Sequence, residues 1–467
     1  MGSSLALPTV WHLFNLRESP FFQQTLRAGQ DRYPIELFVG RQRDTERLLR
    51  AVAGSPASSR QAVHGPVGVG KTTLVEHVKA RLAAERPRVL SYPTPVLVQA
   101  TDTADKLALK VLGYVYDAVV SNGDDATRAY EPVETARQLI RAFRVTGGGG
   151  GLSLGIPGGP SVGANLTRSQ TYITPATAQP LDLVPRLLTE LAGVVRLHLA
   201  AGGVLVHLNN LENLTDEAAD HAARVLRDLR DACFLVDGYH WLVVGTTEAI
   251  RHVVSGVPQL RSAFAVPRPL GPLAFDELVE LLARRYAHVR LDSRQPIREP
   301  VEREALRELY ALFAGDLRGT LRALDQAAVE LLGYGGAGAA APMAWADMRP
   351  VLRQAYGDEL AGALTPTQAS HLAGLVERDV AGADLAGAFT QKEVQAALGV
   401  AQSTASTVLA DLQRLGYVRE ADRQGGAAVA RPPGSARVTR AEASGGSKGG
   451  RPATAYAFTG ATRLVYG

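Results

Sequence analysis

One glycine-spaced segment constrains the fold of this chain most strongly. Residues 65–72 read Gly-Pro-Val-Gly-Val-Gly-Lys-Thr, after a short apolar run and before a stretch with apolar residues at helical spacing. Closely spaced glycines let the backbone turn through conformations that other residues avoid. We therefore expect a strand over 60–64, a loop over 65–73 and a helix over about 74–82.

The remainder of the first 270 residues repeats this alternation. Strands are expected within 89–99, 203–208 and 241–245, and helices over about 181–200 and 216–232. Asp102 is expected to cap a further helix that runs to about residue 120. Short apolar strands that alternate with long amphipathic helices predict an α/β fold, a parallel sheet with helices on both faces. Residues 272–333 predict a small helical bundle.

Length and composition exclude several classes of protein. The 467 residues suit two or three domains, and no run of 18 uncharged apolar residues indicates a membrane span. The N-terminus lacks the pattern of a secretion signal, so we predict a cytoplasmic protein. Cys233 is the only cysteine, which excludes an internal disulfide and a cysteine zinc site.

The glycine-spaced loop also fits G-x-x-x-x-G-K-[ST], the Walker A pattern that binds nucleotide phosphates. Its backbone N–H groups and the N-terminus of the following helix attract phosphate. Lys71 is predicted to reach the β- and γ-phosphates, and the Thr72 hydroxyl to bind Mg²⁺. ATP and Mg²⁺ are therefore the predicted cofactors, and the predicted loop contacts are Gly65, Pro66, Val67, Gly68, Val69, Gly70, Lys71, Thr72 and Thr73.

Further segments resemble motifs of AAA+ ATPases and occur in the order of that family. The segment LFVGRQRDTERLLR (37–50) resembles the part laid against adenine, with Val39, Gly40 and Arg41 as the match. GTTEAI (245–250) resembles the strand end with a polar sensor, which is Thr246 or Thr247.

Two arginines complete the resemblance. AGDLRGTLRALDQA (314–327) resembles the lid motif whose arginine, here Arg318, senses the γ-phosphate. QLRSAFAVPRPLGPL (259–273) resembles the segment before the lid, and Arg261 would be the finger presented to a neighbouring subunit. The arrangement is most similar to the origin-recognition and initiator-loader clade and to related signal-transduction ATPases, over residues 15–335. It implies a P-loop AAA+ parallel sheet in 1–271 and a helical lid in 272–333.

The sequence departs from that family in VLVHLNNLENL (204–214). Asn209 and Asn210 stand where the Walker B motif has an Asp and a water-activating Glu. An amide brings no negative charge and cannot accept a proton from attacking water. We therefore predict slow or absent intrinsic hydrolysis; Glu212 would substitute if a turn displaces the strand end.

Two segments do not follow the alternation of strands and helices. The Gly-rich segment 144–175 predicts either a β-hairpin insertion or a flexible spacer, and as an insertion it would contact DNA or a neighbouring subunit. Residues 334–349 contain GYGGAGAAAP and are predicted to be a linker.

The C-terminal region contains a helix–turn–helix pattern within 389–423. Thr390 is expected to cap one helix and Ser403 a second, which runs to about residue 415 before a strand. With the returning strand expected in 450–460, residues 350–467 resemble the winged helix of MarR-type regulators. From 390 to the end, ten Lys or Arg against five Asp or Glu leave an excess of five positive charges.

This resemblance and the charge predict binding to duplex DNA. The second helix would enter the major groove with polar residues facing the bases: Gln402, Ser403, Thr404, Ser406 and Thr407. The wing would contact phosphates or the minor groove through Arg423, Arg431, Arg437, Arg440, Lys448 and Arg451. A winged helix used only for protein contact is the alternative.

Together the patterns favour an ATP-gated, DNA-binding AAA+ protein that forms homo-oligomers and has no membrane partner, with recruitment of a partner enzyme as an option. A transcription regulator or defence-system sensor switched by ATP is one rival. A DNA-stimulated oligomeric motor and a nucleotide-stabilised assembly platform are the others.

Overall fold

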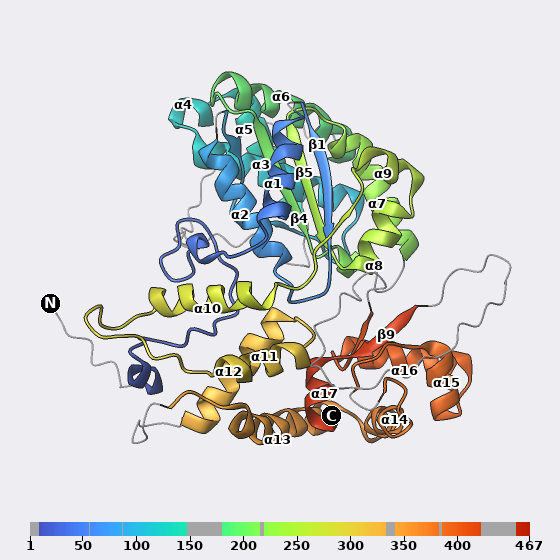
Figure 1. The fold of residues 1–467 in the computed structure, drawn as a ribbon. Coiled ribbons are helices and arrows are strands. Elements are labelled where there is room, and N and C mark those ends of the chain that lie inside the picture. Colours follow the sequence, from blue (N-terminus) through green and yellow to red (C-terminus); the bar gives the residue numbers. More distant parts are fainter. Residues whose placement is uncertain are drawn as a thin grey trace.

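The computed structural model describes residues 9–55, 57–85, 87–146, 180–214, 219–332, 341–382, 385–421 and 454–467 (Figure 1). Most of the expected Gly-rich insertion, 144–175, lies outside these ranges. So does the wing with its six predicted phosphate contacts, Arg423, Arg431, Arg437, Arg440, Lys448 and Arg451.

A parallel sheet forms the centre of the first half of the chain, which confirms the predicted α/β fold. Its strands are β1 (Ser59–His64), β2 (Val89–Leu90), β3 (Val96–Leu97), β4 (Gly203–Asn209), β5 (Tyr239–Gly245) and β6 (Arg268–Pro269). Their order is β2-β4-β5-β1-β6, and β3 also pairs with β4. Because His64 pairs with Gly245 and Leu208 with Val243, the carboxyl ends of β1, β4 and β5 meet at one edge.

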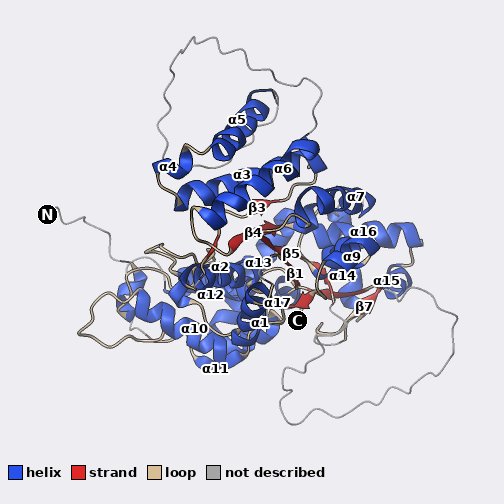
Figure 2. Cartoon of the chain, turned by 90° about the horizontal axis from the view of Figure 1, so that it is seen from above, coloured by secondary structure: helices blue, strands red, loops and turns tan. Residues whose placement is uncertain are grey.

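Helices cover both faces of this sheet (Figure 2). Apolar side chains of α1 (Gln42–Ala53) and α2 (Lys71–Ala84) pack on one face. The helices α3 (Ala104–Asn122), α6 (Pro180–Leu197) and α7 (Ala219–Leu229) pack on the other. The other elements of this region are the helix α5 (Glu131–Thr146) and the shorter η1 (Val10–Phe14), η2 (Ile35–Leu37), α4 (Asp125–Arg128), η3 (Leu211–Leu214), η4 (Arg230–Phe234), α8 (Thr247–Ile250), η5 (Arg251–Ser255) and α9 (Pro258–Ala263).

Two helix starts differ from expectation. Helix α2 begins at Lys71 and not at Leu74, because Gly70 adopts a left-handed φ of 93° that turns the loop directly into the helix. Helix α3 is capped by Thr103, whose side chain accepts the N–H of Lys106. Asp102, predicted as the cap, is instead buried and forms an ion pair with Lys110 at 2.6 Å.

The region expected as a lid contains α10 (Phe275–His288), α11 (Arg303–Leu312) and α12 (Leu317–Leu332), here called the lid helices. They share one hydrophobic core with Trp11 and Phe14 near the N-terminus. Two C-terminal helices join the same core, α13 (Trp345–Ala363) and α17 (Gly460–Tyr466). Helix α13 thus begins inside the range expected as a linker.

The remaining C-terminal elements are α14 (Pro366–Glu377), β7 (Phe389–Thr390), α15 (Gln391–Leu398), α16 (Gln402–Arg414), β8 (Val418–Glu420) and β9 (Ala455–Phe458). The strands form an antiparallel sheet in the order β7-β9-β8. Thr390 caps α15 as predicted, and Glu393 completes a capping box. Ser403 is not a cap, since α16 begins at Gln402 after Ala401.

Stability is expected to fall in acid because His240 is buried in β5. The ring Nδ1 lies 3.0 Å from the Ser59 hydroxyl, and burial lowers the pKa of His240 to about 4. In the unfolded chain that pKa is near 6.5, so the unfolded state binds the proton first as pH falls. The stabilisation by the buried neutral ring is complete above about pH 6.5 and is lost as the pH falls towards 4. The free energy of unfolding then decreases by about 3 kcal/mol. Urea unfolding at a series of pH values measures this loss. His240→Asn removes the titrating ring, so the dependence of the free energy of unfolding on pH is expected to weaken by the equivalent of up to one bound proton.

Candidate functional site

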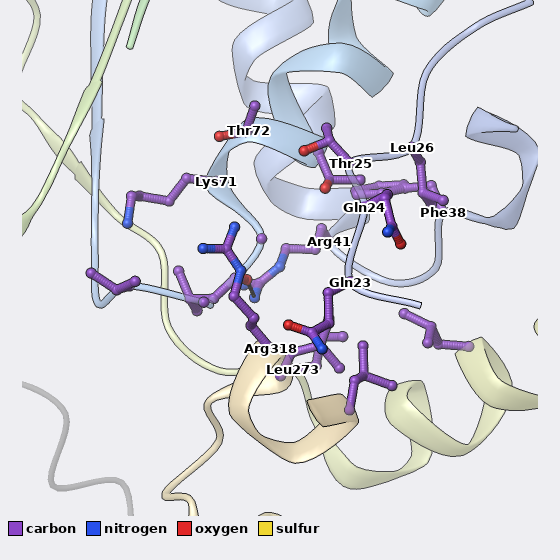
Figure 3. Close-up of a pocket in the computed structure, with 18 of the residues that line it drawn as sticks. Gln23, Gln24, Thr25, Leu26, Phe38, Arg41, Lys71, Thr72, Leu273 and Arg318 are labelled. Carbon is purple, nitrogen blue, oxygen red and sulfur yellow. Dashed lines mark hydrogen bonds between the residues drawn. The ribbon is translucent and has the colours of Figure 1, made fainter. Parts of the chain in front are cut away.

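A cavity lies at the carboxyl edge of the sheet, between the glycine-spaced loop and the lid helices. It encloses about 1020 Å³, part of it open to solvent. Its walls come from the N-terminal segment, the loop, the ends of β4 and η3, and helices α10 and α12 (Figure 3). Residues 67–73 all line this cavity, whereas Gly65 and Pro66, which were also predicted as loop contacts, do not.

The loop has the backbone geometry of an anion cradle. Gly68 and Gly70 have φ of 81° and 93°, in the left-handed region that favours glycine. The Lys71 ammonium donates to the carbonyls of Gly65 at 2.8 Å and Pro66 at 2.7 Å, which secures the loop from within. The N-terminus of α2 therefore faces the cavity with its backbone N–H groups.

Four cationic side chains line the cavity: Arg41, Lys71, Arg285 and Arg318. Arg41 donates to the Val69 carbonyl at 2.8 Å. Burial lowers the pKa of Arg41, yet a guanidinium remains charged at neutral pH. Arg318 extends from α12 towards the loop beside Arg41 (Figure 3). The electrostatic environment thus suits a polyanion.

The lid contacts the loop directly at Gly68. A Cβ atom on Gly68 would lie 1.9 Å from Oδ1 of Asp316, which also accepts the Gly319 N–H at 3.1 Å. Burial raises the pKa of the Asp316 carboxyl. Only glycine therefore allows this approach, and the sequence analysis did not single out Asp316.

An apolar wall completes the cavity on the side of α10. The apolar lining residues are Leu26, Phe38, Val39, Leu273, Leu281, Leu317 and Leu321, and the polar Gln23, Gln24 and Thr25 also line the cavity. Figure 3 shows Gln24 and Leu26 beside Phe38, and Gln23 nearer to Arg318 and Leu273.

Arg285 of α10 holds this N-terminal segment in place. Its guanidinium donates to the carbonyls of Phe22 at 2.6 Å and Pro20 at 3.3 Å and lies 3.9 Å from the centre of the Phe22 ring. Burial lowers the pKa of Arg285 to about 9. No motif marks residues 20–26 or Arg285, so the sequence analysis missed them.

The predicted Asn pair also lines the cavity. Asn209 Nδ2 donates to the Thr72 hydroxyl at 3.4 Å, and Asn210 has a left-handed φ of 64°. Glu212 also lines the cavity and accepts the Thr246 N–H at 3.3 Å. Asn209, Asn210 and Glu212 are therefore beside the loop residue predicted to bind Mg²⁺.

Other predicted residues do not line the cavity. Thr246 caps α8 by accepting the Ala249 N–H, while the Thr247 hydroxyl lies 3.2 Å from His64 Nδ1. Gly40 lies against the lid, since a Cβ there would be 2.5 Å from the Glu277 carboxylate. Arg261 is exposed on α9, away from the lining residues.

The second predicted site is on α16. Its buried face consists of Ala405, Val408, Leu409 and Leu412. The five predicted base-reading residues, Gln402, Ser403, Thr404, Ser406 and Thr407, are all exposed. Gln391 of α15 donates to the Ser406 hydroxyl at 2.6 Å and the Gln402 carbonyl at 3.0 Å, which fixes the start of α16.

The described ranges contain no cluster of three or more His, Cys, Asp or Glu side chains suited to a metal ion. Among the described helices, none has the length and apolar character needed to cross a membrane.

A scan against protein-family models and a search of curated proteins gave no match. Solved structures with partial similarity include a Walker-type ATPase of Pyrococcus abyssi, with a TM-score of 0.47 and 13% identity over 96% of this chain and 99% of that one. The Aeropyrum pernix ORC2 protein has a TM-score of 0.46 and 16% identity over 96% of each chain. The Aeropyrum pernix ORC1 protein in complex with DNA has a TM-score of 0.40 and 16% identity over 83% of this chain and 86% of that one. All three scores are low, so function is inferred below from the residues of this chain.

Proposed function

We propose that the chain is an ATP-binding AAA+ protein that binds duplex DNA through a C-terminal winged helix. ATP gates DNA engagement or assembly, and intrinsic hydrolysis is weak or absent. One observation carries the proposal: the glycine-spaced loop shares a cavity with four cations, and one of them, Arg318, lies on a helix that shares a core with C-terminal helices.

The residues of the cavity fit ATP and Mg²⁺. The glycine cradle and Lys71 suit the phosphates, and the leucine wall between α10, α12 and residues 23–26 suits the base. Mg²⁺ commonly takes few protein ligands and completes its shell with phosphate oxygens and water, and the Thr72 hydroxyl would be its protein ligand here. When bound, Mg²⁺–ATP supplies an activated phosphoryl group, and Arg318 and Arg41 would neutralise its charge.

The exposed polar face of α16 supports the DNA-binding part of the proposal. Five uncharged polar side chains project beside a buried apolar face, as in a helix that enters a major groove. The three-stranded sheet β7-β9-β8 next to it has the form of a wing base. The basic residues of 423–451 would then contact the phosphates.

Contacts between the lid helices and the C-terminal helices supply a route for gating. Arg322 of α12 forms an ion pair with Glu359 of α13 at 2.9 Å. Arg463 of α17 donates to the carbonyls of Ala311 at 3.2 Å and Leu312 at 2.7 Å. A ligand held by Arg318 therefore shifts the arrangement of the lid helices relative to the C-terminal helices that position α16. This requires that the ligand binds one arrangement more tightly than the other.

The first experiment measures unfolding with ATP–Mg²⁺ at about 100 times its Kd. Binding is expected to raise the free energy of unfolding by about 2.7 kcal/mol. Lys71→Ala removes the phosphate contact and is expected to abolish this rise, while Lys392→Ala, exposed on α15, retains it.

The second experiment tests gating. DNA affinity with and without ATP is expected to differ by roughly 5- to 150-fold, and Lys71→Ala is expected to lose the difference. Wild-type protein that gains no stability from ATP would contradict the nucleotide part of the proposal. An equal DNA affinity in both conditions would contradict the gating part.

The Asn pair favours a second candidate, an ATP-held switch such as a transcription regulator or defence-system sensor. Asn209 and Asn210 line the cavity where family members carry the Walker B acids. Homo-oligomerisation belongs to the proposal as well, with exposed Arg261 presented to a neighbour's nucleotide. Light scattering with and without ATP tests that part.

A further inference from the structure

Glu212 is the acidic group in the cavity. Among the described residues that line it, four side chains are cationic and Glu212 alone is a carboxylate. It lies on η3, immediately after the strand β4 that carries Asn209. A carboxylate among cations around a phosphate site marks a candidate proton acceptor, since the amides of the Asn pair cannot take a proton.

A turn at Asn210 brings Glu212 to this position. Asn210 adopts a left-handed φ of 64°, which asparagine tolerates better than most residues. The chain therefore leaves the line of β4 and forms η3, which points Glu212 at the end of β5. There its Oε2 accepts the Thr246 N–H at 3.3 Å, beside Gly245.

We propose that Glu212 is the general base for ATP hydrolysis in this chain and replaces the acid missing at Asn210. This inference rests on the proposed function, in the form in which intrinsic hydrolysis is weak and not absent, and deepens it. Glu212 accepts one proton from a water molecule as the water oxygen bonds to the γ-phosphorus. The bond from that phosphorus to the bridging oxygen breaks, ADP leaves with the electron pair, and the proton passes from Glu212 to solvent.

The backbone contact of Glu212 defines the test variants. Glu212→Gln retains an oxygen that accepts the Thr246 N–H but loses the ability to take a proton. Glu212→Asp retains the carboxylate on a shorter side chain. Glu308→Gln, exposed on α11 and outside the cavity, is the matched control for loss of one negative charge.

Three quantities are measured with ATP–Mg²⁺, with and without duplex DNA: single-turnover phosphate release, the nucleotide retained on the protein, and the rise in unfolding midpoint. Lys71→Ala is the blank. Glu212→Gln is expected to release phosphate at a rate roughly 10²-fold below that of wild type, or at a still lower rate. It should keep the rise in midpoint and retain ATP where wild type retains ADP. Glu212→Asp should restore part of the rate, and Glu308→Gln all of it.

The outcomes separate this inference from the proposed function. Release at the wild-type rate by Glu212→Gln would overturn the role of Glu212, and so would a wild type that binds ATP but releases no phosphate above the blank. In both cases ATP binding would stand. Absence of any ATP-induced rise in the wild-type midpoint would instead overturn the proposed function itself. A purely structural role predicts normal turnover in Glu212→Gln and a loss of stability in Glu212→Ala.

Discussion

DNA affinity is expected to fall by roughly 10³-fold between about 50 mM and about 200 mM salt, if the six basic wing residues each neutralise one phosphate. Each contact releases counterions, so the logarithm of affinity declines linearly with the logarithm of salt concentration. Fluorescence anisotropy of a labelled duplex over a salt series measures the slope. The triple variant Arg431→Ala, Arg437→Ala, Arg440→Ala is expected to reduce the slope by about three.

Gln402→Ala is the matched control, because the residue is exposed at the start of α16 and carries no charge. It should weaken discrimination between duplexes by about 1–3 kcal/mol and leave the salt slope unchanged. Binding that does not respond to salt would contradict phosphate contacts by the wing. It would favour the alternative in which the winged helix contacts protein.

Gly68→Ala is expected to weaken ATP binding by roughly 10²-fold or more. The methyl group would overlap Asp316 Oδ1, and the φ of 81° costs about 1–2 kcal/mol for a residue with a side chain. The lid must then withdraw or the loop must change its conformation, and overpacking of this kind costs about 1–3 kcal/mol. Titration with a fluorescent ATP analogue measures the affinity.

Gly357→Ala in α13 is the control for this substitution. A Cβ there meets no atom within 4 Å, and alanine in a helix interior is expected to stabilise the protein by about 0.5–1 kcal/mol. Equal ATP affinity in wild type and Gly68→Ala would show that the contact between Asp316 and the loop does not contribute to binding.

The glycine-spaced loop and the parallel sheet were predictable because their signals are local. The spacing of Gly65, Gly70 and Lys71 and the alternation of strands with helices need no knowledge of distant residues. Local hydrogen bonding also predicted the Thr390 cap. The same reasoning gave the wrong cap at Asp102, because this side chain forms a buried ion pair with Lys110. Neighbouring Thr103 caps the helix instead.

The rest of the site depends on contacts between distant segments. Gln23 to Leu26 line the cavity because Arg285, some 260 residues later, binds the backbone at Pro20 and Phe22. Nothing in the local pattern of residues 20–26 indicates that contact. Asp316 likewise gains its position from its approach to Gly68. The turn at Asn210 entered the prediction only as a condition for Glu212 to substitute for the missing acid. The backbone conformation of one asparagine cannot be predicted from its neighbours in sequence.

The shared core of the lid has a consequence for synthesis of the chain. Trp11 and Phe14 are made first, yet they pack in the same core as Leu464. The sheet needs nothing beyond β6 and can form while the ribosome is still translating later residues. The lid core must wait until residue 464 has left the exit tunnel. During that interval the early apolar residues lack Leu464, one member of their final core, so a nascent chain would have a formed glycine-spaced loop before it has a finished lid core.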